Sequence, residues 1–250
     1  MLKSQNIYQL FIRCMWPAGK VMGGSSSINY MVYARGNRRD YDRWAAMGNT
    51  GWSYDDVLPY FIKSEDNKNP KYAATKYHGT GGYLTVGEAP FKTPLADGFM
   101  RAGHELGYNV RDCNGEFQTG FMLSQGTVRD SARCSASKAF LVPARNRTNL
   151  HVSKNSRVLR LLIDPKTKRT VGVEFEKSGR NFKVYVTKEV VLSAGTKGSP
   201  KILMLSGVGP VNHLYDMGIN VIADLPVGEN LQAINSCTLS ILLVDQFLIV

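Results

Sequence analysis

The 250-residue sequence has no concentrated basic tract, although it carries 31 lysine and arginine residues against 20 acidic ones. The resulting net charge of +11 invites comparison with nucleic-acid-binding proteins, which gather their positive charge on one face or along one helix. Here the basic residues are scattered, and no run of five occurs. We therefore expect a solvated basic surface and no nucleic-acid partner.

Metal-ligand and disulfide patterns are absent too. The cysteines show no CxxC spacing, and the histidines form no HxxxH or HxH pattern. The residues concerned are Cys14, Cys113, Cys134 and Cys237, and His78, His104, His151 and His213. This dispersion favours free structural thiols over a disulfide framework and predicts no metal site.

Long hydrophobic runs are also missing. No window of 18 residues is apolar throughout, so no membrane span is predicted. Residues 1–16 lack the uninterrupted apolar core and the small-residue cleavage site of a signal peptide, which leaves the compartment unknown. The hydrophobic content of 43% is ordinary for a globular protein, and the chain is long enough for one large domain or parts of two.

What the sequence does contain is a stretch rich in glycine and serine at residues 20–36, KVMGGSSSINYMVYARG. A glycine pair lets the backbone approach a ligand closely, and the serines offer hydroxyls and amides at the start of the next element. Flexible linkers have a similar composition. Because these serines lead into the apolar segment INYMVYARG, we interpret the stretch as a turn that wraps a flat, phosphate-bearing cofactor.

Helix signals follow this stretch. A short helix is predicted over residues 40–47, and a second begins after an N-cap at Ser53. A third opens at Thr93-Pro94 and closes at Gly107, and a fourth covers residues 135–144. The predicted buried faces are Val57, Leu58, Phe61 and Ile62 for the second helix, and Leu95, Phe99, Ala102 and Leu106 for the third.

From His151 onward the pattern alternates with a period of two. Residues 152–163 and a hairpin around Ser178-Gly179 predict a three-stranded antiparallel meander. Residues 189–193, EVVLS, read as a short buried strand, and AGTKGSP turns into a helix that contains Pro200. Such a turn can present backbone amides to a phosphate, although GTKGS does not match the full GxGxxG motif. The same residues would also allow tight packing of the strand against the helix, so both interpretations stay open.

Two of these stretches carry a resemblance. Residues 20–36 resemble the first signature of the glucose–methanol–choline (GMC) flavoprotein oxidoreductases, and residues 193–210, SAGTKGSPKILMLSGVGP, resemble the second. The similarity covers residues 14–232 and is strongest to the glucose dehydrogenase branch. It implies an FAD-dependent enzyme that oxidises the CH–OH group of an alcohol or sugar and passes electrons to a quinone or oxygen.

The resemblance also implies an architecture. We expect an α/β fold of mixed α+β character, in which residues 14–232 form a partial FAD-binding domain that includes the meander. The N-terminal Rossmann βαβ unit and most of the substrate domain would be lacking, and residues 1–13 and 233–250 would be non-homologous ends. A polypeptide of this kind is expected neither to hold FAD tightly nor to turn over substrate alone. The alternative is a catalytically dead isoform that acts as an interaction protein.

Matching positions imply which residues touch the cofactor. The expected contacts are Val21, Ser25, Asn29, Tyr30, Met31, Val32 and Val158. Asn29 would lie nearest the isoalloxazine ring, and the backbone at Val158 would meet the adenine end. Ala18 replaces an arginine that is common just before the motif. No catalytic residue is assigned, because the family's histidine and its histidine or asparagine partner belong to a portion beyond this sequence.

One further segment is ambiguous. Residues 67–86 read as a long surface connection that enters a strand. In the GMC family such a connection reaches toward the substrate side, so His78 is either an ordinary loop histidine or an entrance residue.

Overall fold

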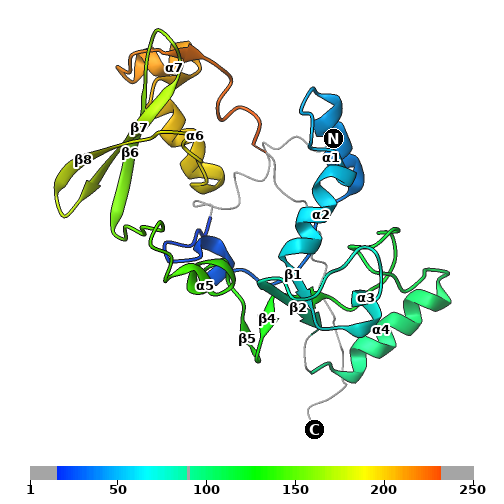
Figure 1. Ribbon diagram of the computed structural model, residues 1–250. Coiled ribbons are helices and arrows are strands. Elements are labelled where there is room, and N and C mark those ends of the chain that lie inside the picture. Colours follow the sequence, from blue (N-terminus) through cyan, green and yellow to red (C-terminus); the bar gives the residue numbers. More distant parts are fainter. Residues whose placement is uncertain (1–15, 89–90, 232–250) are drawn as a thin grey trace. The chain divides into compact units, whose positions relative to one another are not determined.

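The computed structural model describes residues 16–88 and 91–231 (Figure 1). The chain divides into two compact units, Met1–Leu150 and His151–Val250. The predicted boundaries at residues 13 and 232 lie outside the described residues and stay predictions. The expectation of a mixed α and β fold is confirmed, since both units combine helices with strands.

Two helices open the first unit. Helix α1 (Arg38–Ala46) begins after Asn37, whose side chain accepts a hydrogen bond from the Arg39 amide. Helix α2 (Tyr54–Ser64) has the predicted cap at Ser53, which forms a capping box with Asp56. The predicted face of α2 is the half-buried one, whereas Asp55 and Tyr60 are exposed. Helix α2 leads directly into β1 (Glu65–Asn67) (Figure 1).

A small mixed sheet forms the centre of this unit. Strand β1 pairs in parallel with β2 (Leu84–Glu88), and β2 pairs antiparallel with β3 (Gln125–Gly126). The chain after the glycine–serine stretch joins the same sheet, because Val32 bridges Gly126 and the Tyr33 amide donates to the Gln125 carbonyl at 2.9 Å. The next strands, β4 (Val128–Arg129) and β5 (Ala132–Arg133), make a tight hairpin. The fourth predicted helix appears as η3 (Ser137–Leu141) and α5 (Val142–Ala144).

The segment predicted as a surface connection is partly internal. It contains a short helix, α3 (Pro70–Ala73), and enters β2 as expected. However, Asn67, Tyr72 and His78 are buried. The surface prediction is therefore wrong for these residues: the side chains of Asn67 and His78 find polar partners inside the unit, and the Tyr72 ring packs against His78 with ring centroids 5.7 Å apart.

Helix α4 (Pro94–Glu105) confirms the third predicted helix but not its predicted face. Leu95, Phe99 and Leu106 are 45%, 59% and 74% exposed, and the buried residue is Gly103. A Cβ atom on Gly103 would lie 2.6 Å from the Phe121 ring. The helix thus approaches Phe121 closely at a residue without a side chain, and the Phe99 ring also contacts Phe121, with ring centroids 5.1 Å apart, while it stays more than half exposed.

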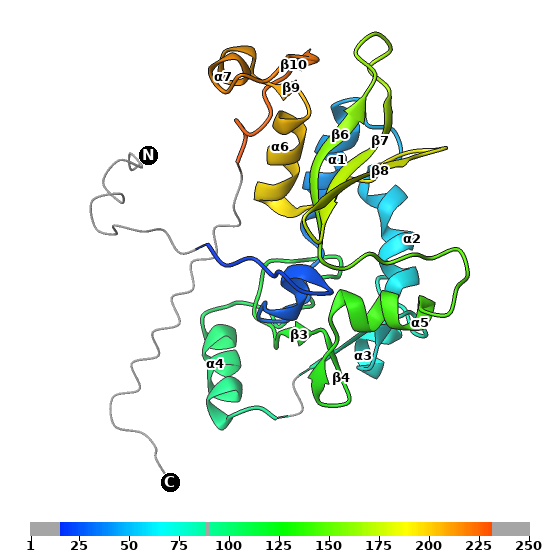
Figure 2. The same cartoon turned by 90° about the vertical axis from the view of Figure 1, so that its left-hand side faces the viewer.

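The second unit is built on the predicted meander. Strands β6 (Ser156–Ile163), β7 (Thr170–Lys177) and β8 (Arg180–Tyr185) pair antiparallel in sequence order (Figure 2). The β7–β8 turn uses Ser178 and Gly179 in left-handed conformations, with φ of 52° and 73°, as the sequence predicted. A register shift lies between Val158 and Arg160 on β6.

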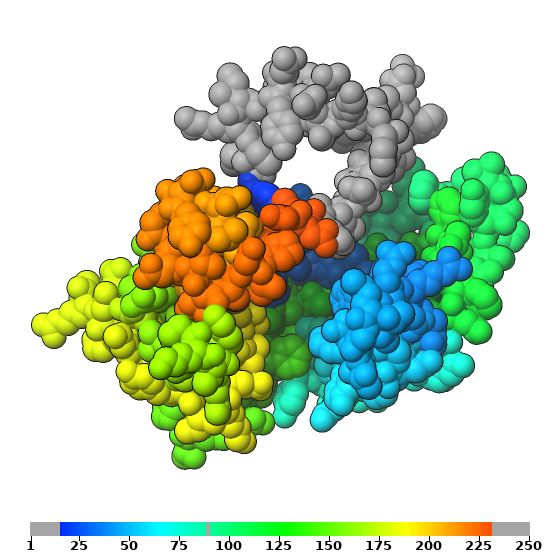
Figure 3. Space-filling model, turned by 90° about the horizontal axis from the view of Figure 1, so that it is seen from above, coloured from blue at the N-terminus to red at the C-terminus, as the bar shows by residue number. Residues whose placement is uncertain are grey.

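Helix α6 (Gly195–Leu205) packs on β6, and the Leu161 amide donates to Ser206 Oγ at 2.8 Å. Helix α7 (Val211–Asp216) and the parallel pair β9 (Val208–Gly209) and β10 (Ala223–Asp224) complete the unit. In Figure 3 the yellow and orange atoms of residues 195–231 lie against the yellow-green atoms of the meander.

The predicted strand at residues 189–193 is absent. The helix that follows it is present and contains Pro200, but Val191 is 77% exposed and the five residues pair with no described strand. A strand exists only through a hydrogen-bonded neighbour, so an apolar run without a partner stays irregular. Within the described residues, no helix combines the length and hydrophobicity needed to cross a bilayer.

Candidate functional site

The glycine–serine stretch forms a turn stabilised by its own side chains. Gly23 and Gly24 take left-handed φ values of 93° and 57°, and a 3-10 helix, η2 (Gly24–Ser27), follows. Ser26 Oγ donates to the Gly23 carbonyl at 2.6 Å, and Ser27 Oγ donates to the Met22 carbonyl at 3.0 Å. Two of the serine hydroxyls are therefore used to shape the turn.

The two glycines serve different purposes. A Cβ on Gly23 would lie 2.8 Å from Ser27 Oγ and 3.2 Å from the Ser137 nitrogen, so this glycine permits close packing within the protein. A Cβ on Gly24 would meet no heavy atom within 4 Å. Only Gly24 borders open space, and it is there that the backbone remains accessible to a ligand.

The residues after the turn present their side chains outward. Tyr30 is 96% exposed, and Val21 and Val32 are more than half exposed. Asn29 is exposed as well, and its Oδ1 accepts hydrogen bonds from the Met31 amide at 3.1 Å and from Arg133 Nη1 at 2.6 Å. Met31 has a φ of 62°, which is unusual for a residue with a side chain.

Six of the seven predicted contact residues belong to one segment of the first unit, and we call the exposed side of this segment the residue 21–32 surface. They are Val21, Ser25, Asn29, Tyr30, Met31 and Val32. Val158 belongs to the second unit, on the edge strand β6, beside the register shift. A bulge at a sheet edge is common near binding sites. A joint site formed by Val158 and the residue 21–32 surface stays a prediction.

Three features of this surface suit a flat group that is apolar in part and carries hydrogen-bond acceptors. They are the open space beside Gly24, the exposed apolar side chains and the NH2 group of the Asn29 side chain. A flavin has this chemistry. The residues of this surface thus fit the cofactor that the sequence resemblance implies, although their contacts with it stay a prediction.

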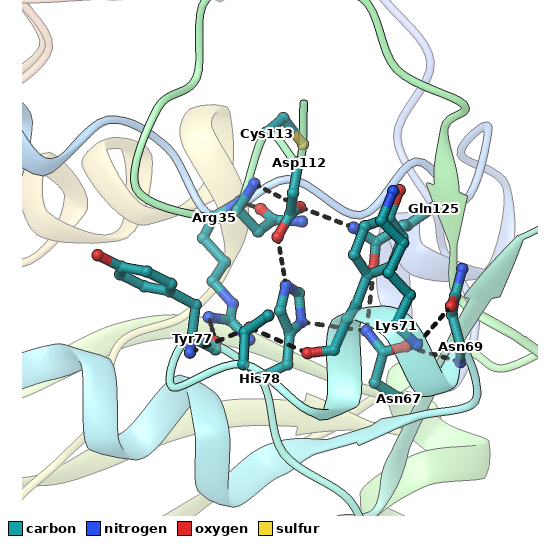
Figure 4. A network of polar contacts seen from close by, with 12 residues as sticks. Arg35, Asn67, Asn69, Lys71, Tyr77, His78, Asp112, Cys113 and Gln125 are labelled. Atoms are coloured by element: carbon teal, nitrogen blue, oxygen red, sulfur yellow. Dashed lines mark hydrogen bonds and ion pairs between the residues drawn. The ribbon is translucent and has the colours of Figure 1, made fainter. Parts of the chain in front are cut away.

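Sequence reasoning missed a buried polar network in the same unit (Figure 4). His78 lies between two carboxylates: its Nδ1 is 2.9 Å from Glu65 Oε1, and its Nε2 is 2.7 Å from Asp112 Oδ2. Arg35 Nη2 pairs with Glu65 Oε2 at 2.7 Å. Two positive and two negative groups thus meet inside the unit, which we call the His78 network.

Neutral amides connect the His78 network to the backbone of residues 33–35. Gln125 Nε2 donates to Asp112 Oδ1 at 3.0 Å. Asn114 donates to the Tyr33 carbonyl at 3.1 Å and accepts from the Arg35 amide at 2.9 Å. Because residues 33–35 directly follow the residue 21–32 surface, the network anchors one end of that surface.

The charge states follow from the contacts. Burial opposes the charged form of His78, but the hydrogen bonds and charges of Asp112 and Glu65 outweigh it and raise the pKa of the imidazole. Burial likewise opposes ionisation of Glu65, yet the bonds from His78 and from the Gly79 amide, with the Arg35 charge, lower its pKa. The pKa of Asp112 is lowered in the same way, by His78 and the Asn114 amide.

His78 is therefore a buried histidine whose two carboxylate partners favour its protonated form, and it is not an exposed loop residue. A role as an entrance residue stays a prediction. A weak signal existed in the run Glu65–Asn67, where polar residues end an amphipathic helix and form a strand. No feature of a single sequence pairs these residues with a histidine 13 positions further on. Among the described residues, no cluster of histidine, cysteine, aspartate and glutamate is arranged to hold a metal ion.

Comparison with known proteins identifies the family. The GMC oxidoreductase profile matches residues 12–234. Glucose dehydrogenase [FAD, quinone] of Drosophila melanogaster is 52% identical over 221 residues, which cover 88% of this chain and 35% of that protein. Oxygen-dependent choline dehydrogenase of Brucella anthropi is 46% identical over 219 residues, 86% of this chain and 39% of that protein.

A solved structure agrees with these matches. An FAD-dependent oxidoreductase from Chaetomium thermophilum superposes with a TM-score of 0.76 at 33% identity, covering 84% of this chain and 38% of that one. The chain spans less than two fifths of the length of each of these three proteins. On the profile match and these identities, the chain belongs to the GMC oxidoreductase family.

Proposed function

We propose that this chain supplies the central part of the FAD site of an oxidoreductase that acts on CH–OH groups, with an alcohol or sugar as substrate and a quinone or oxygen as acceptor. The observation that carries the proposal is the residue 21–32 surface, which is braced from within the unit while its outer side stays open. The substrate and acceptor classes rest on the names of the relatives, which cite glucose, choline, quinone and oxygen.

The chemistry divides between cofactor and protein. Bound FAD supplies the hydride acceptor of an alcohol oxidation. This chain's own part is to bind and orient the flavin: the residue 21–32 surface gives an apolar face, and Asn29 gives hydrogen-bond donors. The base that takes the alcohol proton is not assigned to any residue of this chain.

A chimera tests this function. The 221 matching residues of the Drosophila melanogaster enzyme are replaced by those of this chain, and the purified protein is examined for bound FAD and for glucose-dependent reduction of a quinone. We expect a yellow, active protein. A chimera that folds but stays colourless would contradict the proposal and favour an interaction protein without flavin.

A matched pair of glycine variants locates the binding surface. Gly24→Ala and Gly48→Ala each place a Cβ where no heavy atom lies within 4 Å. Gly24, with φ of 57°, lies in the left-handed region that an alanine can enter, whereas Gly48, with φ of 97°, lies outside it, so the control carries at least as much backbone strain. At Gly24 the methyl group enters the space proposed for the flavin, and we expect FAD affinity to fall by about tenfold or more, which corresponds to about 1.4 kcal/mol. The Gly48→Ala chimera, altered only beyond the end of α1, should keep its FAD.

A further inference from the structure

Arg133 makes an unusual connection between the β4–β5 hairpin and the residue 21–32 surface. Its Nη1 donates to the Ser26 carbonyl at 3.1 Å and to Asn29 Oδ1 at 2.6 Å, across more than a hundred residues of sequence. Within the described part of the chain, no carboxylate forms an ion pair with Arg133. A half-buried guanidinium is thus engaged by neutral oxygen atoms alone, in charge-assisted hydrogen bonds.

These contacts determine how the Asn29 carboxamide is oriented. Its oxygen accepts from two N–H donors, Arg133 Nη1 and the Met31 amide. Exchanging the oxygen and nitrogen positions would bring the NH2 group against both donors, so this orientation is the only one that satisfies them. Among the described residues, no acceptor binds Asn29 Nδ2, and because Asn29 is exposed its two N–H groups are available to a ligand.

The backbone next to Asn29 is held in an uncommon shape. Met31 is left-handed, and the Thr127 amide donates to its carbonyl at 2.9 Å. Such a conformation persists only where the surroundings over-determine it, and strained residues gather at ligand sites. Here the surroundings are the Asn29 side chain on one side of the peptide and Thr127 on the other. Loss of Arg133 would free the Asn29 oxygen and so weaken one of the two restraints.

We propose that Arg133 is a positioning residue of the flavin site, which orients the Asn29 amide so that its two N–H groups donate to acceptor atoms of the isoalloxazine ring. This inference rests on the proposed function. Arg133 itself acts only through Asn29 and the Ser26 carbonyl. Arg133 is charged and has no ion-pair partner among the described residues, so its hydrogen bond to Asn29 is stronger than one from a neutral donor. A strong bond helps an exposed amide to keep its orientation.

The first test needs no cofactor and uses the 250-residue chain. Hydrogen exchange of peptides covering residues 26–32 is compared in the wild type, Arg133→Gln and Arg145→Gln, where Arg145 is an exposed arginine of the same unit. We expect exchange in Arg133→Gln to be faster by on the order of tenfold, the effect of losing a hydrogen bond to a charged group. Arg145→Gln should match the wild type, and Arg133→Lys should restore part of the protection. Unchanged exchange in Arg133→Gln would overturn the positioning role.

The second test separates orientation from contact. Asn29→Asp keeps an oxygen for Arg133 and Met31 but removes both outward N–H donors. In the chimera described above, we expect this variant to keep wild-type exchange over residues 26–32 while its flavin absorption spectrum shifts and its FAD affinity falls about tenfold. Arg133→Gln should shift the same spectrum and also speed exchange.

The outcomes distinguish the two proposals. If the wild-type chimera binds FAD but neither variant alters the spectrum or the affinity, Arg133 only braces a loop and this inference is wrong. If the wild-type chimera folds and binds no FAD, the proposed function fails, and the inference about the flavin fails with it even where Arg133→Gln speeds exchange.

Discussion

At the scale of single residues, His78 shows how much a buried charge depends on its partners. The ring is 5% exposed and both of its nitrogens contact a carboxylate. Isolated buried charges are costly, and a paired set is tolerated only if every member is satisfied. Together with His78, Glu65, Asp112 and Arg35 fulfil that condition, so loss of any one of the four would remove a charged partner from another.

The variant His78→Gln tests this dependence. It leaves the buried Glu65 and the partly buried Asp112 with one positive neighbour instead of two, and we expect the free energy of unfolding to fall by about 3–5 kcal/mol. Urea denaturation followed by tryptophan fluorescence measures the change, because all three tryptophans, Trp16, Trp44 and Trp52, lie in the first unit. His104→Gln, at an exposed position on α4, is the matched control and should leave the midpoint unchanged.

Residue roles were predictable only where a motif specifies them. Residues 20–36 carry the GMC signature, and six of the predicted contacts come from this stretch; their contacts with a flavin stay a prediction. Arg133 and His78 were not predictable, because each acts through a partner distant in sequence. A single sequence gives the local pattern of a helix or turn but not which strand edge meets which hairpin.

At the scale of elements, helix α2 depends on its N-terminal cap. Ser53 and Asp56 satisfy each other's backbone amides in a capping box, whereas Thr93, the N-cap residue of α4, makes no such side-chain bond. The two helices therefore allow a direct comparison between an N-cap residue whose side chain accepts a backbone hydrogen bond and one whose side chain does not.

We expect Ser53→Ala to lower the free energy of unfolding by about 0.5–2 kcal/mol, since the Asp56 amide loses its acceptor. Thr93→Ala should change it by no more than a few tenths. Thermal and urea unfolding of both variants give the comparison. Equal losses in the two would show that the cap at Ser53 contributes nothing beyond the intrinsic preference of the residue.

Element boundaries were predicted well where local chemistry decides them. The cap at Ser53, the proline at the start of α4 and the Ser178-Gly179 turn all lie where expected. The failures concern partners. Residues 189–193 lack a neighbouring strand among the described residues, and the predicted face of α4 stays largely exposed although Phe99 contacts Phe121. Tertiary context overrides periodicity in both cases.

At the scale of the whole molecule, the His78 network makes stability depend on pH in both directions. The folded-state pKa of His78 is raised, so its contribution is complete below the unfolded value of about 6.5 and is lost as pH rises through the folded value. The folded-state pKa values of Glu65 and Asp112 are lowered, so their contribution is complete above their unfolded values of about 4 and is lost as pH falls.

We therefore expect the first unit to be most stable between about pH 4.5 and 6.5 and to weaken on either side. Burial raises the pKa of Cys113 to about 11, so its thiol adds to the alkaline loss only above its unfolded pKa of about 8.5. Urea midpoints from pH 4 to 9, read from tryptophan emission, should trace this maximum. In His78→Gln the decline that begins above pH 6.5 should disappear; a decline of the same size in that variant would assign it to another group.

Helix α4 has a practical consequence for anyone who handles this polypeptide. Leu95 and Phe99 of α4 and Leu106 at its C-cap are large apolar side chains that are largely exposed to solvent. Exposed apolar surfaces of this kind bind the dye ANS and phenyl resins, and they promote aggregation as the protein or salt concentration rises. Mild detergent and low ionic strength are therefore the conditions under which the chain is best kept dispersed.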